Sequence, residues 1–154
     1  MTVRDLQTSN VKTVSSDTDL AVVARLMWEG DCGAVPVVTE DRKVIGMITD
    51  RDICIAAATR SKPPAEIRAG EVISTNHGVH AVKPDDDVRV ALRTMRKHKV
   101  RRLPVVDREQ RLAGIVSIND LAINASSSQP DSVPAQEFLE TFQAICAHEK
   151  HAVA

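Results

Sequence analysis

The chain has 154 residues, of which 43% are apolar, 27% are charged and 2% are aromatic, and its formal net charge is -1. A chain of this length forms one compact unit or two small halves that share a core, and the scarcity of aromatics predicts an aliphatic core. The balanced charge does not call for nucleic acid or an anionic membrane as a partner.

The N-terminal residues MTVRDLQTSN contain no apolar leader segment, and no stretch approaches the roughly 18 apolar residues of a membrane span. We therefore expect a cytoplasmic protein. The three cysteines, Cys32, Cys54 and Cys146, lie far apart and have no paired spacing. They predict neither a disulfide framework nor a zinc site, and we expect buried free thiols.

An internal duplication dominates the sequence: residues 11–55 and 79–123 align without a gap at a constant offset of 68. Each copy begins with a short β run, followed by a helix that a capping Asp or Thr opens. Apolar residues at helical spacing then predict that one face of each helix is core. These residues are Leu20, Val23, Ala24, Met27 and Trp28 in the first copy, and Val88, Ala91, Leu92 and Met95 in the second.

Two β-rich runs and a second helix complete each copy. The pattern predicts a mixed fold of the α/β (α+β) class, built from two β-α-β-β-α units. The expected strands are 34–38 and 44–49, then 103–106 and 112–117, and the expected second helices begin near Asp50 and Ile118. We expect a first repeat over 1–60, a linker with two prolines over 61–70, and a second repeat over 71–125.

A polar spacer is expected over 126–134, followed by a C-terminal helix and tail over 135–154. The helix is predicted to be amphipathic, with Phe138, Leu139, Phe142, Ile145 and Cys146 on one face. Two interpretations remain open: the helix folds back on its own repeats, or it serves dimerisation or the docking of a partner.

Two motifs recur in register in the duplicated unit. VPVV (35–38) matches LPVV (103–106), and GMITDRD (46–52) matches GIVSIND (114–120). With these motifs in order, the sequence from Val3 to Ala125 resembles the CBS domain family, named after cystathionine β-synthase, whose paired form is called a Bateman module. The TDRDI segment and the FQAIC helix are similar to stand-alone bacterial paired-CBS proteins of the mycobacterial hypoxic-response type. The resemblance implies two repeats packed with pseudo-twofold symmetry in a regulatory module without catalytic activity. We further expect this module to form a homodimer.

The resemblance also implies two clefts between the repeats, in which family members bind adenosine-containing ligands such as AMP, ATP or S-adenosylmethionine. The motif aspartate holds the ribose hydroxyls in such members, with the Ser or Thr hydroxyl close by. The corresponding pairs here are Asp120 with Ser117, and Asp52 with Thr49. The same spacing is also that of a helix capping box, with a hydroxyl at the N-cap and a carboxylate three residues later, and one residue can serve both ends.

The copies differ just before the LPVV strand, where basic residues contact ligand phosphates in nucleotide-binding relatives. The second copy has Arg101 and Arg102, and a guanidinium suits a phosphate through its planar donor fork. We therefore predict a main cleft for a phosphorylated nucleotide, formed by Arg101, Arg102, Ile115, Ser117 and Asp120. A second, doubtful cleft is formed by Gly33, Ala34, Thr49 and Asp52, and is either empty or takes a less anionic nucleoside. Alternatively, the basic stretch 89–111 is simply a solvated surface.

The expected function is therefore that of a regulatory module that binds an adenine nucleotide and signals to an unknown effector protein. AMP, ADP, ATP, NAD and S-adenosylmethionine are not distinguished. The alternative is a structural or protein-interaction module with vestigial, ligand-free clefts. No phosphate loop, nucleophile elbow or HExxH motif indicates an enzyme, and no metal cofactor is expected. His77, His80 and His98 have no evident partners, and His148 and His151 suggest at most adventitious metal binding.

Overall fold

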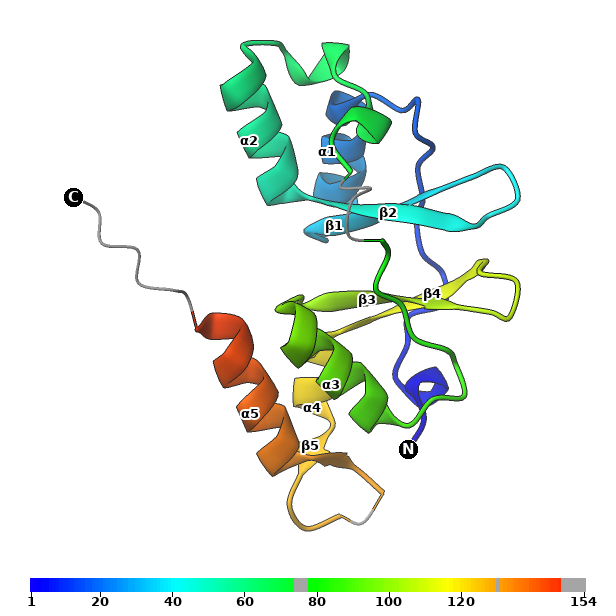
Figure 1. The fold of residues 1–154 in the computed structure, drawn as a ribbon, viewed down its shortest axis with the longest axis vertical. Coiled ribbons are helices and arrows are strands. Elements are labelled where there is room, and N and C mark those ends of the chain that lie inside the picture. Colours follow the sequence, from blue (N-terminus) through cyan, green and yellow to red (C-terminus); the bar gives the residue numbers. More distant parts are fainter. Residues whose placement is uncertain (74–77, 130, 148–154) are drawn as a thin grey trace, which may run out of the picture. The chain divides into compact units, whose positions relative to one another are not determined.

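The computed structural model describes residues 1–73, 78–129 and 131–147, which fall into two compact units. The repeat-1 unit contains Asn10–Val79 and Val106–Leu112. The repeat-2 unit contains Met1–Ser9, His80–Val105 and the chain from Ala113 onward. Each unit combines helices with a pair of strands, so the predicted mixed fold class is confirmed (Figure 1).

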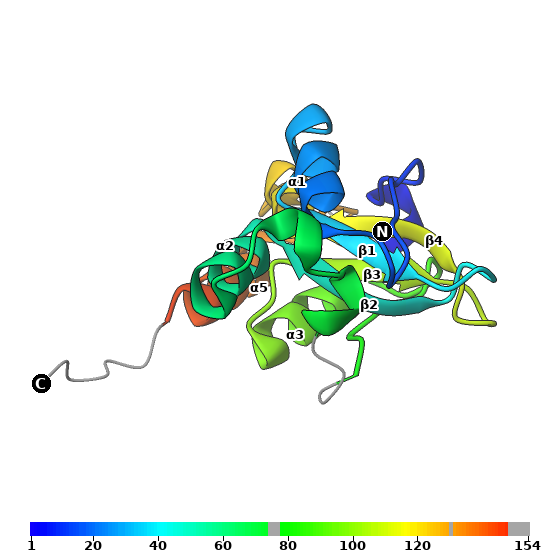
Figure 2. The ribbon, with the colours of Figure 1, turned by 90° about the horizontal axis from the view of Figure 1, so that it is seen from above.

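The repeat-1 unit consists of two helices that cover one face of a two-stranded sheet. Its elements are α1 (Leu20–Glu29), β1 (Ala34–Val38), β2 (Val44–Thr49) and α2 (Asp50–Arg60). The backbone N–H of Val22 donates to the Asp19 carboxylate, which caps α1. β1 and β2 are antiparallel, and both helices lie on the same side of them (Figures 1 and 2). The core is aliphatic, as expected.

The segment expected as a linker packs against α1. It forms two short 3-10 helices, η2 (Pro64–Glu66) and η3 (Ala69–Glu71). Ile67 and Ala69 are fully buried, and the carbonyl of Ile67 accepts the backbone N–H of Leu20 at 2.9 Å. These contacts fasten the segment to the first turn of α1.

The repeat-2 unit repeats this plan. Its elements are α3 (Val88–His98), β3 (Arg102–Val106), β4 (Leu112–Ser117) and α4 (Ile118–Ile123), with Asp87 as the cap of α3. The predicted core face of α3 is confirmed, because all four of its apolar residues are buried. In both units the expected first β run is reduced to one parallel bridge, Val14 with Val37 and Val82 with Val105.

The N-terminal residues pack against the second repeat rather than the first. Val3, at the start of η1 (Val3–Asp5), is fully buried and its backbone N–H donates to Asp86 O at 2.9 Å. Arg4 forms an ion pair with Asp85 at 2.7 Å. This segment therefore completes the repeat-2 unit.

The two ends of the segment expected as a polar spacer pair with each other. β5 (Ala125–Ser126) pairs in parallel with β6 (Val133–Pro134), and Val133 is fully buried in the repeat-2 core. Val133 is thus a core residue within the segment expected as a polar spacer. The short bridge returns the chain to the start of the C-terminal helix.

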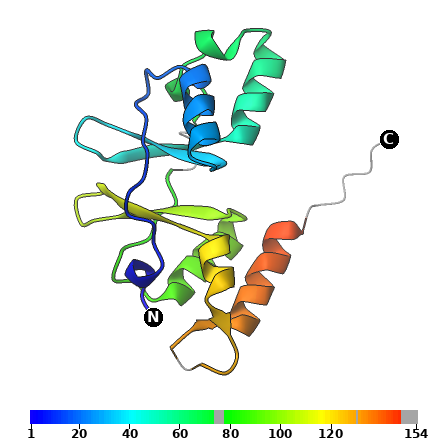
Figure 3. The same cartoon turned by 180° about the vertical axis from the view of Figure 1, so that it is seen from behind.

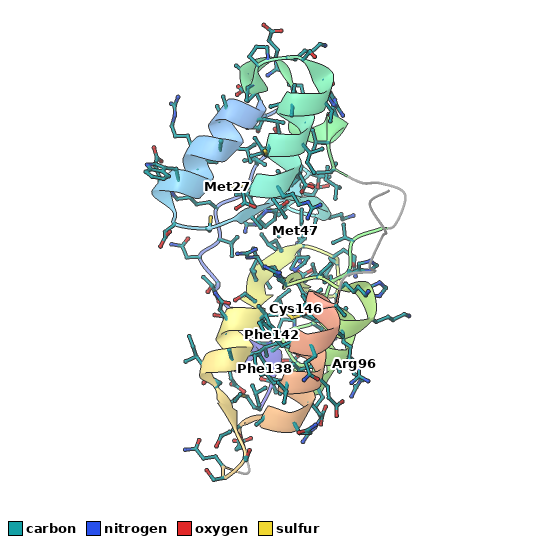
Figure 4. The ribbon with its side chains drawn as sticks, turned by 90° about the vertical axis from the view of Figure 1, so that its left-hand side faces the viewer. Met27, Met47, Arg96, Phe138, Phe142 and Cys146 are labelled. Atoms are coloured by element: carbon teal, nitrogen blue, oxygen red, sulfur yellow. The ribbon has the colours of Figure 1, made fainter. Side chains whose placement is uncertain are left out.

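The C-terminal helix α5 (Ala135–Cys146) folds back along α3 and beside α4 (Figures 1 and 3). Thr141 and Ile145 are buried on the packed side, and the Thr141 hydroxyl donates to Leu92 O at 3.4 Å. The predicted single apolar face is split, because Leu139 and Phe142 are 47% and 44% exposed. Figure 4 shows Phe138, Phe142 and Cys146 in a row along α5.

Two further expectations were wrong. Trp28 is 87% exposed, because it lies about 80° around α1 from Leu20 and so falls at the edge of the buried stripe. All three cysteines are exposed instead of buried. Cys32 follows α1 in a loop, Cys54 is on the outer side of α2, and Cys146 is the last residue of α5.

Candidate functional site

The structure brings Ser117 and Asp120 together at the junction of β4 and α4. Asp120 Oδ2 accepts the backbone N–H of Ser117 at 2.7 Å and its hydroxyl at 2.6 Å. In return, the backbone N–H of Asp120 donates to the Ser117 hydroxyl at 3.3 Å. The two residues thus form the reciprocal capping box of α4.

Thr49 and Asp52 form the same arrangement where β2 meets α2. Asp52 Oδ2 accepts the backbone N–H of Thr49 at 2.8 Å and its hydroxyl at 2.7 Å. Both aspartates are half-buried. The duplication has therefore preserved the geometry of the motif as well as its sequence.

The capping role leaves one oxygen of each carboxylate available. Among the residues that the structure describes, Oδ1 of Asp52 and Oδ1 of Asp120 accept no hydrogen bond. One carboxylate oxygen has two lone pairs and can accept from two hydroxyls. Each aspartate can therefore cap its helix and still bind a pair of vicinal hydroxyls, whereas Ser117 and Thr49 use their hydroxyl protons to orient the carboxylate.

Arg101 is placed next to this capping box by the backbone. Its carbonyl accepts the N–H of Ile118, the first residue of α4, at 2.8 Å. The equivalent bond in the repeat-1 unit runs from Asp50 N–H to Gly33 O at 3.2 Å. Arg101 therefore lies in the bend before β3, and Arg102 is the first residue of that strand.

The guanidinium groups of Arg101 and Arg102 have no acidic partner in the described parts of the chain. In the same basic stretch, Arg89, Arg96 and Arg111 each form an ion pair with a carboxylate. Arg101 is exposed and Arg102 is half-buried. These two positive charges are thus uncompensated within the described residues.

Ile115 connects the site to the N-terminal segment, which the sequence had not assigned to it. The backbone groups of Ile115 and Thr8 exchange hydrogen bonds of 2.9 and 3.0 Å. A Cβ on Gly114 would approach Thr8 O to 2.8 Å, so the motif glycine permits this contact. Beside it, Gln7 Oε1 is buried without a hydrogen-bond partner among the described residues. Hydrophobic periodicity carries no signal for this contact, because it is made by backbone atoms.

The repeat-1 residues have a different character. Ala34 is buried and is the cross-strand partner of Thr49, and Gly33 is half-buried beside it. These two positions offer backbone groups and space but no charge. The two equivalent capping boxes therefore differ in the side-chain charge at the neighbouring positions.

The histidines were only partly anticipated. The rings of His80 and His98 stack with centroids 3.5 Å apart, so the expectation that they have no partners was wrong. His77, His148 and His151 lie outside the described residues. Within the described ranges, no group of three or more His, Cys, Asp or Glu side chains could hold a metal ion. None of the described helices has the length and apolar character needed to cross a bilayer.

A family model, a curated protein and a solved structure each match most of this chain. The model of the CBS domain matches residues 3–58 and again 69–126. Hypoxic response protein 1 of Mycobacterium tuberculosis is 32% identical over 146 residues, which cover 95% of this chain and 94% of that protein. A crystal structure of Hypoxic Response Protein I with two coordinated zinc ions has a TM-score of 0.74 and 34% identity, covering 82% of this chain and 100% of the other.

A second solved structure carries adenosine compounds. The CBS domain pair of protein MJ0100, in complex with 5'-methylthioadenosine and S-adenosyl-L-methionine, has a TM-score of 0.71 and 27% identity. The match covers 80% of this chain and 94% of that one.

Proposed function

Because this chain belongs to the CBS domain family, we propose that it is a regulatory module that binds an adenine nucleotide and passes the signal to a partner protein. The proposal is carried by Oδ1 of Asp120, which accepts no hydrogen bond from the described residues. Arg101, whose guanidinium has no acidic partner among them, is bonded through its carbonyl to the first residue of the same helix. A carboxylate oxygen that accepts vicinal hydroxyls and a cation that binds phosphate are the two groups that a nucleotide requires. The adenosine ligands of the MJ0100 domain pair support the same ligand class.

The two sites are proposed to differ in their ligands. The repeat-2 site, with Arg101, Arg102, Ile115, Ser117 and Asp120, takes the phosphorylated nucleotide. The repeat-1 site, with Gly33, Ala34, Thr49 and Asp52, is empty or takes a nucleoside with less negative charge. Backbone N–H groups can hydrogen-bond a neutral ligand there, but no side-chain cation is present at Gly33 or Ala34 to offset a phosphate.

Signalling requires that the nucleotide binds one conformational state better than another, since a ligand with equal affinity for both shifts no equilibrium. We propose a homodimer as the signalling form. Its support is the exposed apolar surface of α1 and α2 away from Trp28, where Val22 and Ile55 are 40% and 46% exposed. The same surface favours the second candidate function, a protein-interaction module whose sites bind no ligand.

A thermal-shift panel separates the two candidates. The panel contains AMP, ADP, ATP, NAD and S-adenosylmethionine, each far above its expected Kd. A ligand at about 100 times its Kd stabilises the fold by roughly 2.7 kcal/mol, which gives a clear rise in the midpoint temperature. A rise with at least one compound is expected. If none of them changes the midpoint, the nucleotide proposal fails and the interaction module becomes the better explanation.

A further inference from the structure

A hollow of about 400 Å³ opens in the repeat-1 unit, where the last turn of α1, the loop after it and the first turn of α2 meet. Met27 and Ile53 form its apolar floor, and both are at least nine-tenths buried. Figure 4 labels Met27 on the side of α1 that faces α2. Trp28 lines the same hollow and leaves its ring 87% exposed.

Two carboxylates lie in the wall of this hollow, Asp31 and Asp50. Among the described residues, neither has a cationic partner. Asp50 accepts the backbone N–H of Arg51 at 2.8 Å. The last turn of α1 carries no basic residue, so the negative end of its helix dipole adds to the field of the carboxylates. The positive end of α2 is offset by two acidic residues in its first turn.

The duplication supplies an internal comparison, because two of the equivalent positions in the second repeat are basic. At the offset of 68, Trp28 corresponds to Arg96 and Asp31 corresponds to Lys99. Arg96 forms an ion pair with Glu140 of α5 at 2.8 Å. Lys99 Nζ donates to Ala147 O, just after the end of α5, at 3.2 Å. In the second repeat, both basic side chains are therefore paired with acceptors of the chain itself.

In the first repeat, no cationic side chain of the described residues pairs with Asp31 or Asp50. We infer that this hollow binds a compact organic cation of the quaternary or alkyl ammonium class. The cation lies against the ring of Trp28 and is neutralised by Asp31 and Asp50. A cation over an indole face is attracted by the ring quadrupole, and tryptophan is the strongest of the aromatic residues in this role. The volume falls within the range of small-molecule sites. Gly33 lines this hollow and also belongs to the proposed repeat-1 nucleoside site, whereas Asp52 and Asp120 do not line it.

The fluorescence of Trp28 tests the inference directly, because it is the only tryptophan in the chain and there is no tyrosine. The probes are choline and tetramethylammonium, with 3,3-dimethylbutan-1-ol as the neutral isostere of choline and sodium chloride as the ionic-strength control. We expect a saturable change in emission with the two cations. Neither the neutral alcohol nor the sodium salt should produce one. Equal changes with the alcohol and with choline would overturn the inference.

Two charge-removing variants and a matched control locate the site. Asp31→Asn keeps a residue that tolerates the positive φ of 46° found there, and Asp50→Asn keeps an acceptor for the Arg51 N–H. Each should raise the half-saturating cation concentration about two- to five-fold. Asp41→Asn removes the same charge from an exposed turn outside the hollow and should leave it unchanged.

The inference would be contradicted if the half-saturating cation concentration were unchanged in both Asp31→Asn and Asp50→Asn. A blue shift of the Trp28 emission when the protein alone is concentrated would contradict it as well, because it would mean that a second copy of the chain covers the hollow. Neither outcome depends on nucleotide binding, so the cation site and the proposed function can fail separately.

Discussion

Asp120 Oδ2 accepts two hydrogen bonds from Ser117, one from the backbone N–H at 2.7 Å and one from the hydroxyl at 2.6 Å. The same pair of bonds joins Asp52 to Thr49 in the first repeat. Since the two capping boxes are equivalent, removing either aspartate should cost a similar amount of helix stability. Any difference between the two variants in ligand binding then reports on the ligand and not on the cap.

The first prediction uses this matched pair. Asp120→Ala should lower the free energy of unfolding by about 0.5–2 kcal/mol through loss of the cap. It should also weaken the preferred nucleotide about tenfold or more, because a hydrogen bond to a charged group contributes about 1.5–3 kcal/mol. Asp52→Ala should show a similar loss of stability with nucleotide affinity retained. Urea unfolding and isothermal titration calorimetry measure the two effects.

The contrary result is also informative. Loss of affinity in Asp52→Ala together with retained affinity in Asp120→Ala would place the nucleotide in the repeat-1 site. Retained affinity in both would remove the aspartates from the ligand site and leave them as helix caps.

The second prediction concerns the phosphate. Arg101→Gln should weaken AMP about tenfold while leaving adenosine affinity nearly unchanged, because only the phosphate interacts with the guanidinium. Arg93→Gln is the matched control, since Arg93 is an exposed residue of α3 with the same charge and without an ion pair among the described residues. Titration of both ligands into each variant gives the answer. Equal losses for AMP and adenosine would show that Arg101 does not act on the phosphate.

Much of the fold could be predicted from the sequence, because the duplication repeats every local signal. The helix caps at Asp19 and Asp87, the strand pairs and the buried stripe of α3 follow from periodicity and capping chemistry. The pairing of Ser117 with Asp120 was also visible as a spacing. These are local relationships, which a single sequence specifies well.

Long-range contacts made by backbone atoms could not be predicted. Thr8 reaches Ile115 through main-chain hydrogen bonds, and Val133 enters the core from a polar segment. Trp28 was misplaced because apolar spacing does not distinguish the centre of a buried stripe from its edge. The sequence therefore indicated the spacing of Ser117 and Asp120 but not the N-terminal segment that contacts Ile115.

The third prediction concerns acid stability. Asp107 accepts the backbone N–H groups of Arg111 and Glu109 and the Arg111 guanidinium, and these bonds hold the pKa of its carboxyl below the usual value. Because the folded-state pKa lies below the unfolded-state pKa of about 3.9, this contribution to stability is present above that pH and is lost as the pH falls. Asp107→Asn should therefore be less stable than the parent at pH 7, and the difference should shrink as the pH falls below the unfolded-state pKa of about 3.9. A difference that stays constant with pH in urea unfolding would contradict the assignment.

The fourth prediction tests how α5 is held. Ile145 is 5% exposed and packs into the repeat-2 core, so Ile145→Ala should lower the free energy of unfolding by about 2–5 kcal/mol. Leu139→Ala is the control on the same helix, because Leu139 is 47% exposed and its truncation should cost well under half as much.

The exposed ion pairs of Arg89 with Glu137 and Arg96 with Glu140 add only about 0.2–1 kcal/mol each. Raising the salt concentration should therefore change the stability of the parent far less than Ile145→Ala does. Guanidinium chloride adds salt itself, so urea unfolding at low and high sodium chloride is the measurement to use. A large loss of stability with salt, together with a small effect of Ile145→Ala, would mean that charge rather than apolar burial holds α5 against α3.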